Sequence, residues 1–255
     1  RLSFLLKIIS VFFFLSAAPK NPSRILGGDE TTIDKYPSMA VLLYSPDMVS
    51  YRFFCGGTII NNRSVLSAAH CIYTDTVETI RVRVGSSFSA SGGEILPLAA
   101  MIIHPDYSEE TLHNDVTILR TSVQITYSDT VQPAPIAGPS YTVADNEVVW
   151  IAGWGVTEAG VPSDQLRDLQ VFTINQDRCR RRYAFSLIQI TADMICIGKL
   201  NTINNGHCFG DSGGPAYHNG VVIGVCSFGN DCGSPIFPNV NTRVSSYSTW
   251  IQANA

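Results

Sequence analysis

The chain has 255 residues, of which 45% are hydrophobic and 15% are charged. This low charged fraction, without a run of like charges, excludes a disordered protein, and the length suffices for one or two packed cores. The 17 basic and 21 acidic residues give an acidic balance. We therefore expect no binding to nucleic acid or to an anionic membrane surface.

The first segment has the pattern of a secretory signal peptide. Residues 1–18 read RLSFLLKIISVFFFLSAA, with two basic residues, a short apolar core and then small residues. A membrane anchor needs about 20 apolar residues, and Lys7 leaves roughly half of that number. We predict a signal peptide over residues 1–17 and a secreted protein. Residues 1–24 hold four basic residues and no acidic one, so the rest has a net charge of −8.

Short apolar runs separated by Gly, Pro, Asn and Ser follow along the chain. The runs are MAVLLY (39–44), IRVRV (80–84), VTILR (116–120), EVVWIAGW (147–154) and VVIGVCSF (221–228). Such short, spaced runs predict an all-β barrel or sandwich. Residues 121–146, rich in Pro, could join two β halves. At the end, SSYSTWIQANA predicts a short helix capped by Ser245 or Ser246.

Three segments carry residues suited to nucleophilic catalysis. They are LSAAHC with His70, HNDVTILR with Asp115, and CFGDSGGP with Ser212. A serine hydroxyl is a weak nucleophile that needs an adjacent base, and the base needs an orienting partner. Each residue alone is weak evidence, because a single His or Asp in such a setting is usually structural.

The order of these residues separates two catalytic folds. GDSGG also fits the G-x-S-x-G turn of α/β-hydrolases, in which the serine precedes the acid and the histidine. Only 43 residues follow Ser212, and His218 and Asp231 stand there in the wrong order. The order His, Asp, Ser found here is that of chymotrypsin.

The chain has seven cysteines, so they cannot all pair within it. Disulfides are expected in an oxidising compartment, and one cysteine must remain unpaired. The spacing does not suit zinc, because no C-x2-C pair occurs and the histidines are scattered.

From Ile25 onward the chain resembles the trypsin/chymotrypsin family of serine proteases. The motifs ILGGDE, CGGTII, LSAAHC, NDVTILR, AGWG, GDSGGP and VCSFG occur in the family's order, and the tail is similar to insect digestive members. The resemblance implies two six-stranded antiparallel β-barrels with the active site between them and a C-terminal helix. It also implies a protease domain over residues 25–255, with its halves meeting near residues 121–146.

The resemblance implies catalytic roles that follow the family's known template. Ser212 attacks the peptide carbonyl, His70 acts as general base and then acid, and Asp115 holds the imidazole. The backbone N–H groups of Gly210 and Ser212 would form the oxyanion hole.

Activation by proteolysis is implied as well. Residues 18–24 would be an activation propeptide, and a trypsin-like protease would cut between Arg24 and Ile25. The new α-amino group would enter the protein and pair with Asp211, which stands before the nucleophile.

The implied disulfides use six cysteines and leave Cys226 as a buried thiol that acts as a small hydrophobe. They are Cys55–Cys71, Cys179–Cys196 and Cys208–Cys232.

The specificity pocket departs from the trypsin pattern. Where trypsin-like enzymes place Asp at the pocket floor, this chain has Gly206, which argues against cleavage after Arg or Lys. The walls implied by the resemblance are the bulky His207 together with Ser227, Phe228, Gly229 and Asn239. A neutral floor favours chymotrypsin-like cleavage after large apolar residues. The space taken by His207 and Asn239 favours an elastase-like preference for small residues, and a protonated His207 could favour acidic ones.

The overall prediction is a digestive endopeptidase secreted into the extracellular space, such as a gut lumen. We expect a monomer without metal or cofactor; peptide substrates, the activating protease and protein protease inhibitors are its partners. A catalytically silent homologue that acts as a binding module is the alternative. A dedicated protease of venom or haemolymph is a second alternative.

The stretch after residue 24 has eleven Arg and two Lys. Such a bias would keep ion pairs in an alkaline medium, although compositional drift explains it equally well.

Overall fold

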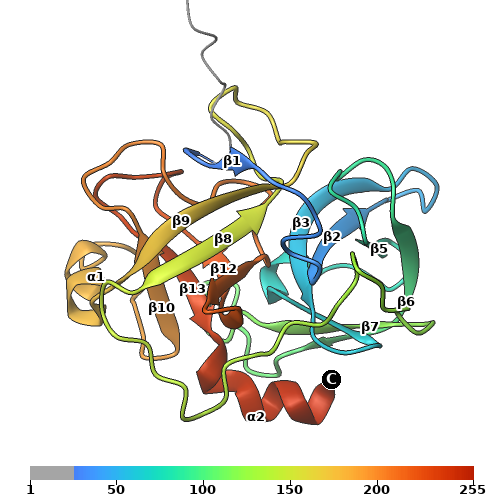
Figure 1. The fold of residues 1–255 in the computed structure, drawn as a ribbon. Coiled ribbons are helices and arrows are strands. Elements are labelled where there is room, and N and C mark those ends of the chain that lie inside the picture. Colours follow the sequence, from blue (N-terminus) through green and yellow to red (C-terminus); the bar gives the residue numbers. More distant parts are fainter. Residues whose placement is uncertain (1–25) are drawn as a thin grey trace, which may run out of the picture.

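Strands dominate the structure, a computed structural model that describes residues 26–255 (Figure 1). The predicted signal peptide and propeptide, including Arg24, lie outside the described residues, as does Ile25. Two antiparallel six-stranded β-barrels lie side by side, so the predicted two-barrel, all-β fold is confirmed. None of the helices in residues 26–255 is long and apolar enough to cross a membrane.

The first barrel is closed by six strands. In order around the barrel they are β2 (Met39–Tyr44), β3 (Arg52–Ile59), β4 (Ser64–Ser67), β7 (Thr117–Thr121), β6 (Glu94–Ile103) and β5 (Ile80–Val84). In β5 the three apolar residues of IRVRV are buried, as its alternation predicts. Arg83 departs from the pattern and is also buried, because its guanidinium donates to the carbonyls of Ala90 and Gly92.

The second barrel follows after residues 122–147. Its strands are β8 (Val148–Gly153), β9 (Arg167–Ile174), β10 (Met194–Gly198), β13 (Asn239–Arg243), β12 (Val221–Phe228) and β11 (Pro215–His218). Pairing of β11 with β8 closes the ring. The two-residue β1 (Asp29–Glu30) adds to the outside of β9.

The C-terminal helix α2 (Val244–Asn254) crosses below both barrels (Figure 1). Its buried residues include Val244, Tyr247 and Ile251, which recur at helical spacing. Arg120 of β7 donates to the carbonyl of Asn254 at 2.6 Å and so ties the helix to the first barrel. The predicted serine cap is wrong, because the helix begins at Val244 and no side chain caps it.

A second helix, α1 (Gln176–Arg182), was not predicted. Its N-terminus is capped by Asn175, whose side-chain oxygen accepts from the Arg178 amide at 3.0 Å. Four arginines lie on this helix, and the last three of them (Arg180, Arg181 and Arg182) complement the negative helix end.

Candidate active site

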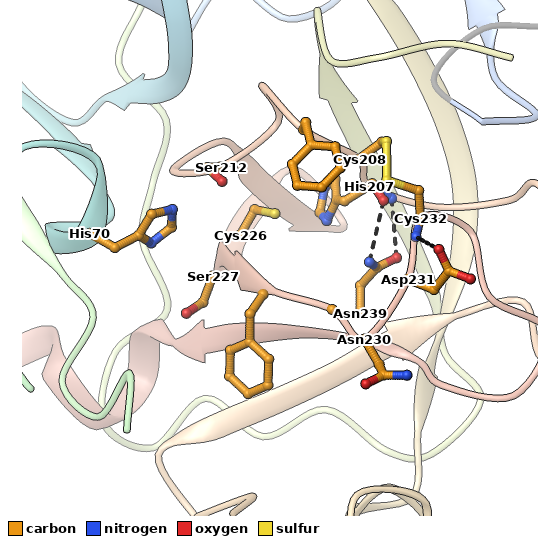
Figure 2. A pocket seen from close by; sticks show the side chains of 13 residues that line it. His70, His207, Cys208, Ser212, Cys226, Ser227, Asn230, Asp231, Cys232 and Asn239 are labelled. Carbon is orange, nitrogen blue, oxygen red and sulfur yellow. Dashed lines mark hydrogen bonds between the residues drawn. A yellow bond between two sulfur atoms is a disulfide. The ribbon is translucent and has the colours of Figure 1, made fainter. Parts of the chain in front are cut away.

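The three candidate catalytic residues come from both barrels. His70 lies in a short 3-10 turn, η1 (Ala69–Cys71), which follows β4, and Asp115 lies two residues before β7. Ser212 lies in the loop between β10 and β11 of the second barrel. His70 and Ser212 line the same cavity of about 440 Å³, and the His70 ring extends toward the side on which Ser212 lies (Figure 2).

Asp115 is completely buried and holds the histidine through two hydrogen bonds. Its Oδ2 lies 2.7 Å from His70 Nδ1, and its Oδ1 accepts from the His70 backbone amide at 2.9 Å. The Ser227 hydroxyl also donates to Oδ2, and Thr242 donates to the Asp115 carbonyl at 2.7 Å. With Nδ1 donating to the carboxylate, a neutral imidazole leaves Nε2 free to accept a proton.

The tight turns around Ser212 require glycine at two neighbouring positions, Gly210 and Gly213. Gly213 has a φ of +76°, and a Cβ there would lie 2.1 Å from Ser67 Oγ. Gly210 has a φ of +96°. Gly210 and Ser212 lie in two consecutive turns, which are closed by hydrogen bonds from the Asp211 amide to the Cys208 carbonyl and from the Gly214 amide to the Asp211 carbonyl. The Gly56 amide donates to the Ser212 carbonyl at 2.8 Å, so β3 of the first barrel supports the turn from behind.

Asp211 is buried beneath this turn. Its carboxylate accepts from the amides of Gly155 and Cys208 at 2.9 and 3.0 Å. Burial raises the pKa of Asp211 to about 6, although the two backbone hydrogen bonds act in the opposite direction. Leu26, the first described residue, accepts from the Gly206 amide at 3.1 Å, so the chain that follows Ile25 runs beside this loop.

Asn239 fills the floor of the pocket. Its Oδ1 accepts from the His207 amide at 3.1 Å, and its Nδ2 donates to the His207 carbonyl at 3.4 Å. A Cβ at Gly206 would lie 2.3 Å from this Oδ1, and one at Gly229 would lie 3.0 Å from Nδ2. The Asn239 carboxamide therefore occupies the space in which a side chain at position 206 would begin.

His207 lines the same pocket and is 3% exposed. Among the described residues, neither of its ring nitrogens has a hydrogen-bond partner. Burial lowers the pKa of His207 to about 4, so the ring is neutral at the pH of most protease assays. A preference for acidic substrate residues through a charged His207 is therefore disfavoured.

Ser227, Phe228 and Gly229 line the pocket, as the resemblance implies, and Cys226 joins them. Cys226 is buried and unpaired, and burial raises the pKa of its thiol. Its cross-strand partner is Asn241, so the two side chains share a face of the sheet.

Some residues of the site were missed from the sequence. Phe209, Asn230 and Asp231 also line the cavity, and their position next to predicted pocket residues was the available signal. Asn241 is fully buried, and within the described residues its amide has no partner. No local pattern in the sequence signals that arrangement.

The structure joins the six other cysteines in three disulfides. They are Cys55–Cys71, Cys179–Cys196 and Cys208–Cys232. In residues 26–255, the one cluster of metal-ligating residue types is Cys55, His70 and Cys71. Both of its sulfurs belong to a disulfide, which leaves no thiolate to bind a metal.

Comparison with known proteins agrees with this geometry. Residues 25–251 match the model of the family described as Trypsin. Alkaline trypsin C of Manduca sexta is 49% identical over 96% of both chains, and trypsin CFT-1 of Choristoneura fumiferana is 48% identical over 94% of both. Achelase-1 of Lonomia achelous is 45% identical over 91% of this chain and 100% of its own length.

Proposed function

The chain belongs to the trypsin family of serine proteases, and on that premise we propose that His70, Asp115 and Ser212 are its catalytic triad. The observation that carries the proposal is that His70 is hydrogen-bonded to the buried Asp115 and lines the same cavity as Ser212. Glycines that shape the serine turn support the same assignment.

In the proposed mechanism, Ser212 Oγ attacks the peptide carbonyl while His70 Nε2 takes its proton. Asp115 stabilises the imidazolium that forms, and the Gly210 and Ser212 amides donate to the oxyanion. His70 then gives the proton to the leaving amine, and water hydrolyses the acyl-enzyme by the reverse steps. Gly229 leaves a backbone edge with which a substrate strand can pair.

The enzyme is made as a zymogen that a trypsin-like protease cuts between Arg24 and Ile25. The freed α-amino group pairs with Asp211 and orders the oxyanion loop. Two observations support this: Asp211 is buried without a cationic partner among the described residues, and Leu26 already runs beside the loop. Such an ion pair would offset the cost of ionising a carboxylate with a raised pKa.

Although the relatives above are named trypsins, we propose a non-tryptic, chymotrypsin-like preference for large uncharged residues. The pocket floor has no carboxylate, because Gly206 and the Asn239 carboxamide stand there. Asp231, the acidic residue that lines the cavity, is exposed and accepts from the Cys232 amide at 2.9 Å. The Asn239 carboxamide also shortens the pocket, which favours an elastase-like preference as the second candidate.

The proposed setting is extracellular, in a digestive lumen. The signal-peptide pattern of residues 1–17 supports secretion. The word alkaline in a relative's name and the excess of Arg over Lys both support work at high pH. Peptide substrates and protein protease inhibitors are the expected partners of a monomer.

The test is a cleavage profile of the activated enzyme. The precursor is cut with trypsin, the trypsin is inhibited, and a mixed peptide library is digested at pH 8 and 10.5 and read by mass spectrometry. A Ser212→Ala chain, treated identically, is the control. Cuts after Tyr, Phe or Leu are expected. Cuts after Ala or Val would identify an elastase-like pocket, cuts after Arg or Lys a tryptic one, and no cuts above the control a binding module.

A further inference from the structure

The segment between α1 and β10 exposes two large apolar side chains. Phe185 is 103% exposed and Leu187 is 99% exposed, the two highest values for large hydrophobic residues within residues 26–255. Tyr183, two residues earlier, is only 1% exposed. The segment therefore offers apolar side chains to solvent directly after a residue that is anchored in the core.

Residues 184–189 are held by few hydrogen bonds, and all of these are local. The Ser186 amide donates to the Tyr183 carbonyl at 2.9 Å, the Ile188 amide to the Ser186 hydroxyl at 3.3 Å, and the Gln189 side chain to the Ser186 carbonyl at 2.8 Å. Segments with few buried contacts and few hydrogen bonds open at low free-energy cost. This segment can thus become the extended strand that a protease requires of its substrate.

We propose that Phe185–Ser186 and Leu187–Ile188 are self-cleavage sites, cut by a second copy of the activated enzyme. The proposal rests on the proposed function, because only a pocket for large uncharged side chains would accept Phe185 or Leu187. In each event, Ser212 Oγ of one copy bonds to the carbonyl carbon of Phe185 or Leu187 of the other. The peptide C–N bond breaks, and the new amine leaves with the proton that His70 took from Ser212. One water molecule then hydrolyses the ester and restores the serine.

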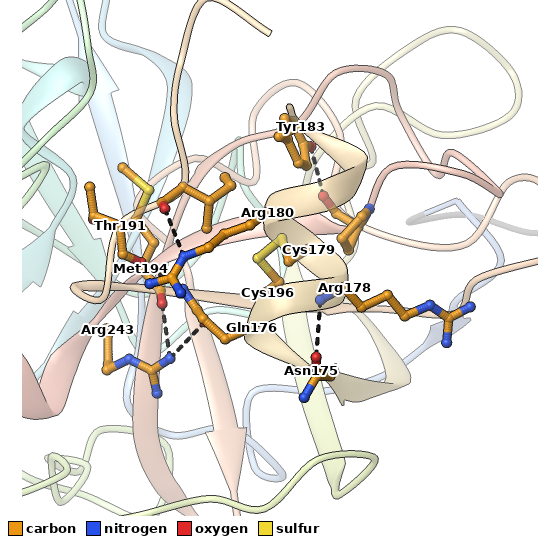
Figure 3. The surroundings of a disulfide bond; sticks show 12 residues. Asn175, Gln176, Arg178, Cys179, Arg180, Tyr183, Thr191, Met194, Cys196 and Arg243 are labelled. Carbon is orange, nitrogen blue, oxygen red and sulfur yellow. Dashed lines mark hydrogen bonds between the residues drawn. A yellow bond between two sulfur atoms is a disulfide. The ribbon is translucent and has the colours of Figure 1, made fainter. Parts of the chain in front are cut away.

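The cut chain stays in one piece because its two ends are anchored on either side. The Cys179–Cys196 disulfide brackets the segment (Figure 3). On the N-terminal side, the Tyr183 hydroxyl donates to the Pro238 carbonyl at 2.8 Å and accepts from the Asn230 amide at 3.3 Å.

Tyr183 also supports the specificity pocket. Its ring packs edge-on against Phe228, with the centroids 5.9 Å apart, and Phe228 and Asn230 line the pocket. Since Tyr183 lies before both cleavage sites and stays anchored, the pocket wall keeps its support after cleavage. The structure thus predicts an active two-chain enzyme held by Cys179–Cys196, in which a double cut releases the dipeptide of Ser186 and Leu187.

The experiment uses an inert copy as the substrate. The Ser212→Ala chain, cut at Arg24 and freed of trypsin activity, is incubated with a trace of activated wild-type enzyme. Intact mass and gels are read with and without reduction. We expect a single cut to add the mass of one water molecule. A double cut should instead lower the mass by the Ser186 and Leu187 residues less one water molecule, because the dipeptide is released. The two chains should separate only after reduction, with new C-termini at Phe185 and Leu187. Wild-type enzyme allowed to nick itself should keep its peptide activity within about twofold, because the pocket wall is intact.

Two matched variants identify the site. In the Ser212→Ala background, Phe185→Ala/Leu187→Ala should slow nicking by about tenfold or more, because alanine forfeits most of the apolar area that enters the pocket. Phe88→Ala makes the same chemical change in another loop, where Phe88 is bridged to Gln165 and less exposed, and should leave nicking unchanged.

A synthetic peptide with the sequence of residues 183–189 separates the two proposals. If the enzyme cuts this peptide after Phe or Leu but leaves the folded segment intact, the self-cleavage proposal is wrong and the proposed function stands. If it cuts neither after Phe nor after Leu, the proposed specificity fails and self-cleavage fails with it. Nicking only after Arg181 or Arg182 would overturn both.

Discussion

Ser227 holds the carboxylate of Asp115 from the side of the second barrel, while His70 holds it from the first. Ser227→Ala removes one donor from a buried carboxylate, which gives the histidine more freedom to turn. A hydrogen bond to a charged group contributes about 1.5–3 kcal/mol, so we expect kcat to fall about ten- to a hundredfold. KM should stay within about twofold, because the hydroxyl serves Asp115 rather than the substrate.

Steady-state kinetics on one peptide substrate measure this effect. Ser248→Ala is the matched control, because Ser248 is also buried but donates within α2 to the Ser245 carbonyl at 3.2 Å. A rise in KM with kcat unchanged would show that Ser227 serves substrate binding instead.

His207 and Asp211 should oppose one another in the pH dependence of stability of the uncut precursor. The pKa of His207 is lowered to about 4, so the unfolded chain binds more protons between pH 4 and 6.5 and stability rises with pH. The pKa of Asp211 is raised to about 6, so the folded chain binds more protons between pH 4 and 6 and stability falls as pH rises. Each effect amounts to about 3 kcal/mol, and they nearly cancel.

Variants that replace one of these two residues should therefore change the pH dependence of the free energy of unfolding in opposite directions. In the uncut Ser212→Ala chain, His207→Ser should make the free energy of unfolding fall relative to the parent from pH 4 to 6.5. Asp211→Asn should make it rise over the same range. Denaturant unfolding at several pH values measures both effects. Subtracting the parent's free energy of unfolding at each pH cancels the contributions of ionisable groups that all the chains share. Parallel curves for parent and variants would refute the assignment.

The structure bonds Asp115 to His70 and places His70 and Ser212 at one cavity. At this scale the sequence could propose these three residues and Gly206, because short motifs carry them. It could not show that Asn239 bonds to the His207 backbone or that the Asn241 amide is buried without a partner, because these features depend on packing between distant strands.

Among the elements, the strands with long apolar runs were predictable and the others were not. MAVLLY and VVIGVCSF coincide with β2 and β12. The strand β6 carries Pro97 and exposed residues, so its pattern is weak. Helix α1 has only Cys179 buried, so no apolar stripe announces it; the Asn175 cap and a disulfide stabilise it instead.

The disulfides allow a comparison of stability with catalysis. Cys55–Cys71 and Cys179–Cys196 span 16 and 17 residues. Loops of this length predict a loss of about 3 kcal/mol when either pair is replaced by alanine. Cys71 is the neighbour of His70, so only loss of Cys55–Cys71 should also lower kcat.

Denaturant unfolding and kcat of the two double variants test this prediction, each measured at a temperature where the variant is folded. An equal loss of kcat in both would mean that the disulfides act through global stability alone.

For the whole molecule, the ionisable groups that matter at high pH are buried tyrosines. Burial raises the pKa of Tyr183 and Tyr247 to about 12, and it raises those of Tyr36, Tyr107 and Tyr217 as well. Unfolded tyrosines titrate near pH 10. Arginine has an ordinary pKa above 12, so unfolded tyrosines lose their protons well before arginine does.

The free energy of unfolding should accordingly fall gently from about pH 9, where the buried Cys226 thiol keeps a proton that the unfolded chain loses, and more steeply from pH 10 toward 12, where the tyrosines add to it. In this window the folded chain keeps protons that the unfolded chain loses, so stability decreases with pH by about 1.4 kcal/mol per pH unit for each such tyrosine. Unfolding of the uncut Ser212→Ala precursor, which lacks the proposed Ile25–Asp211 pair, measures the curve between pH 8 and 12. Tyr247→Phe should reduce the slope by about 1.4 kcal/mol per pH unit, the contribution of one proton. The reason is that the Tyr247 hydroxyl, which is bonded to Asn114 Oδ1 at 2.9 Å, is then absent. Ser248→Ala, one residue away, should leave the slope unchanged. A slope that Tyr247→Phe leaves unchanged would contradict the assignment to tyrosines. An additional decline from about pH 8, found only in the activated chain, is what the proposed pair of the Ile25 amine with Asp211 predicts.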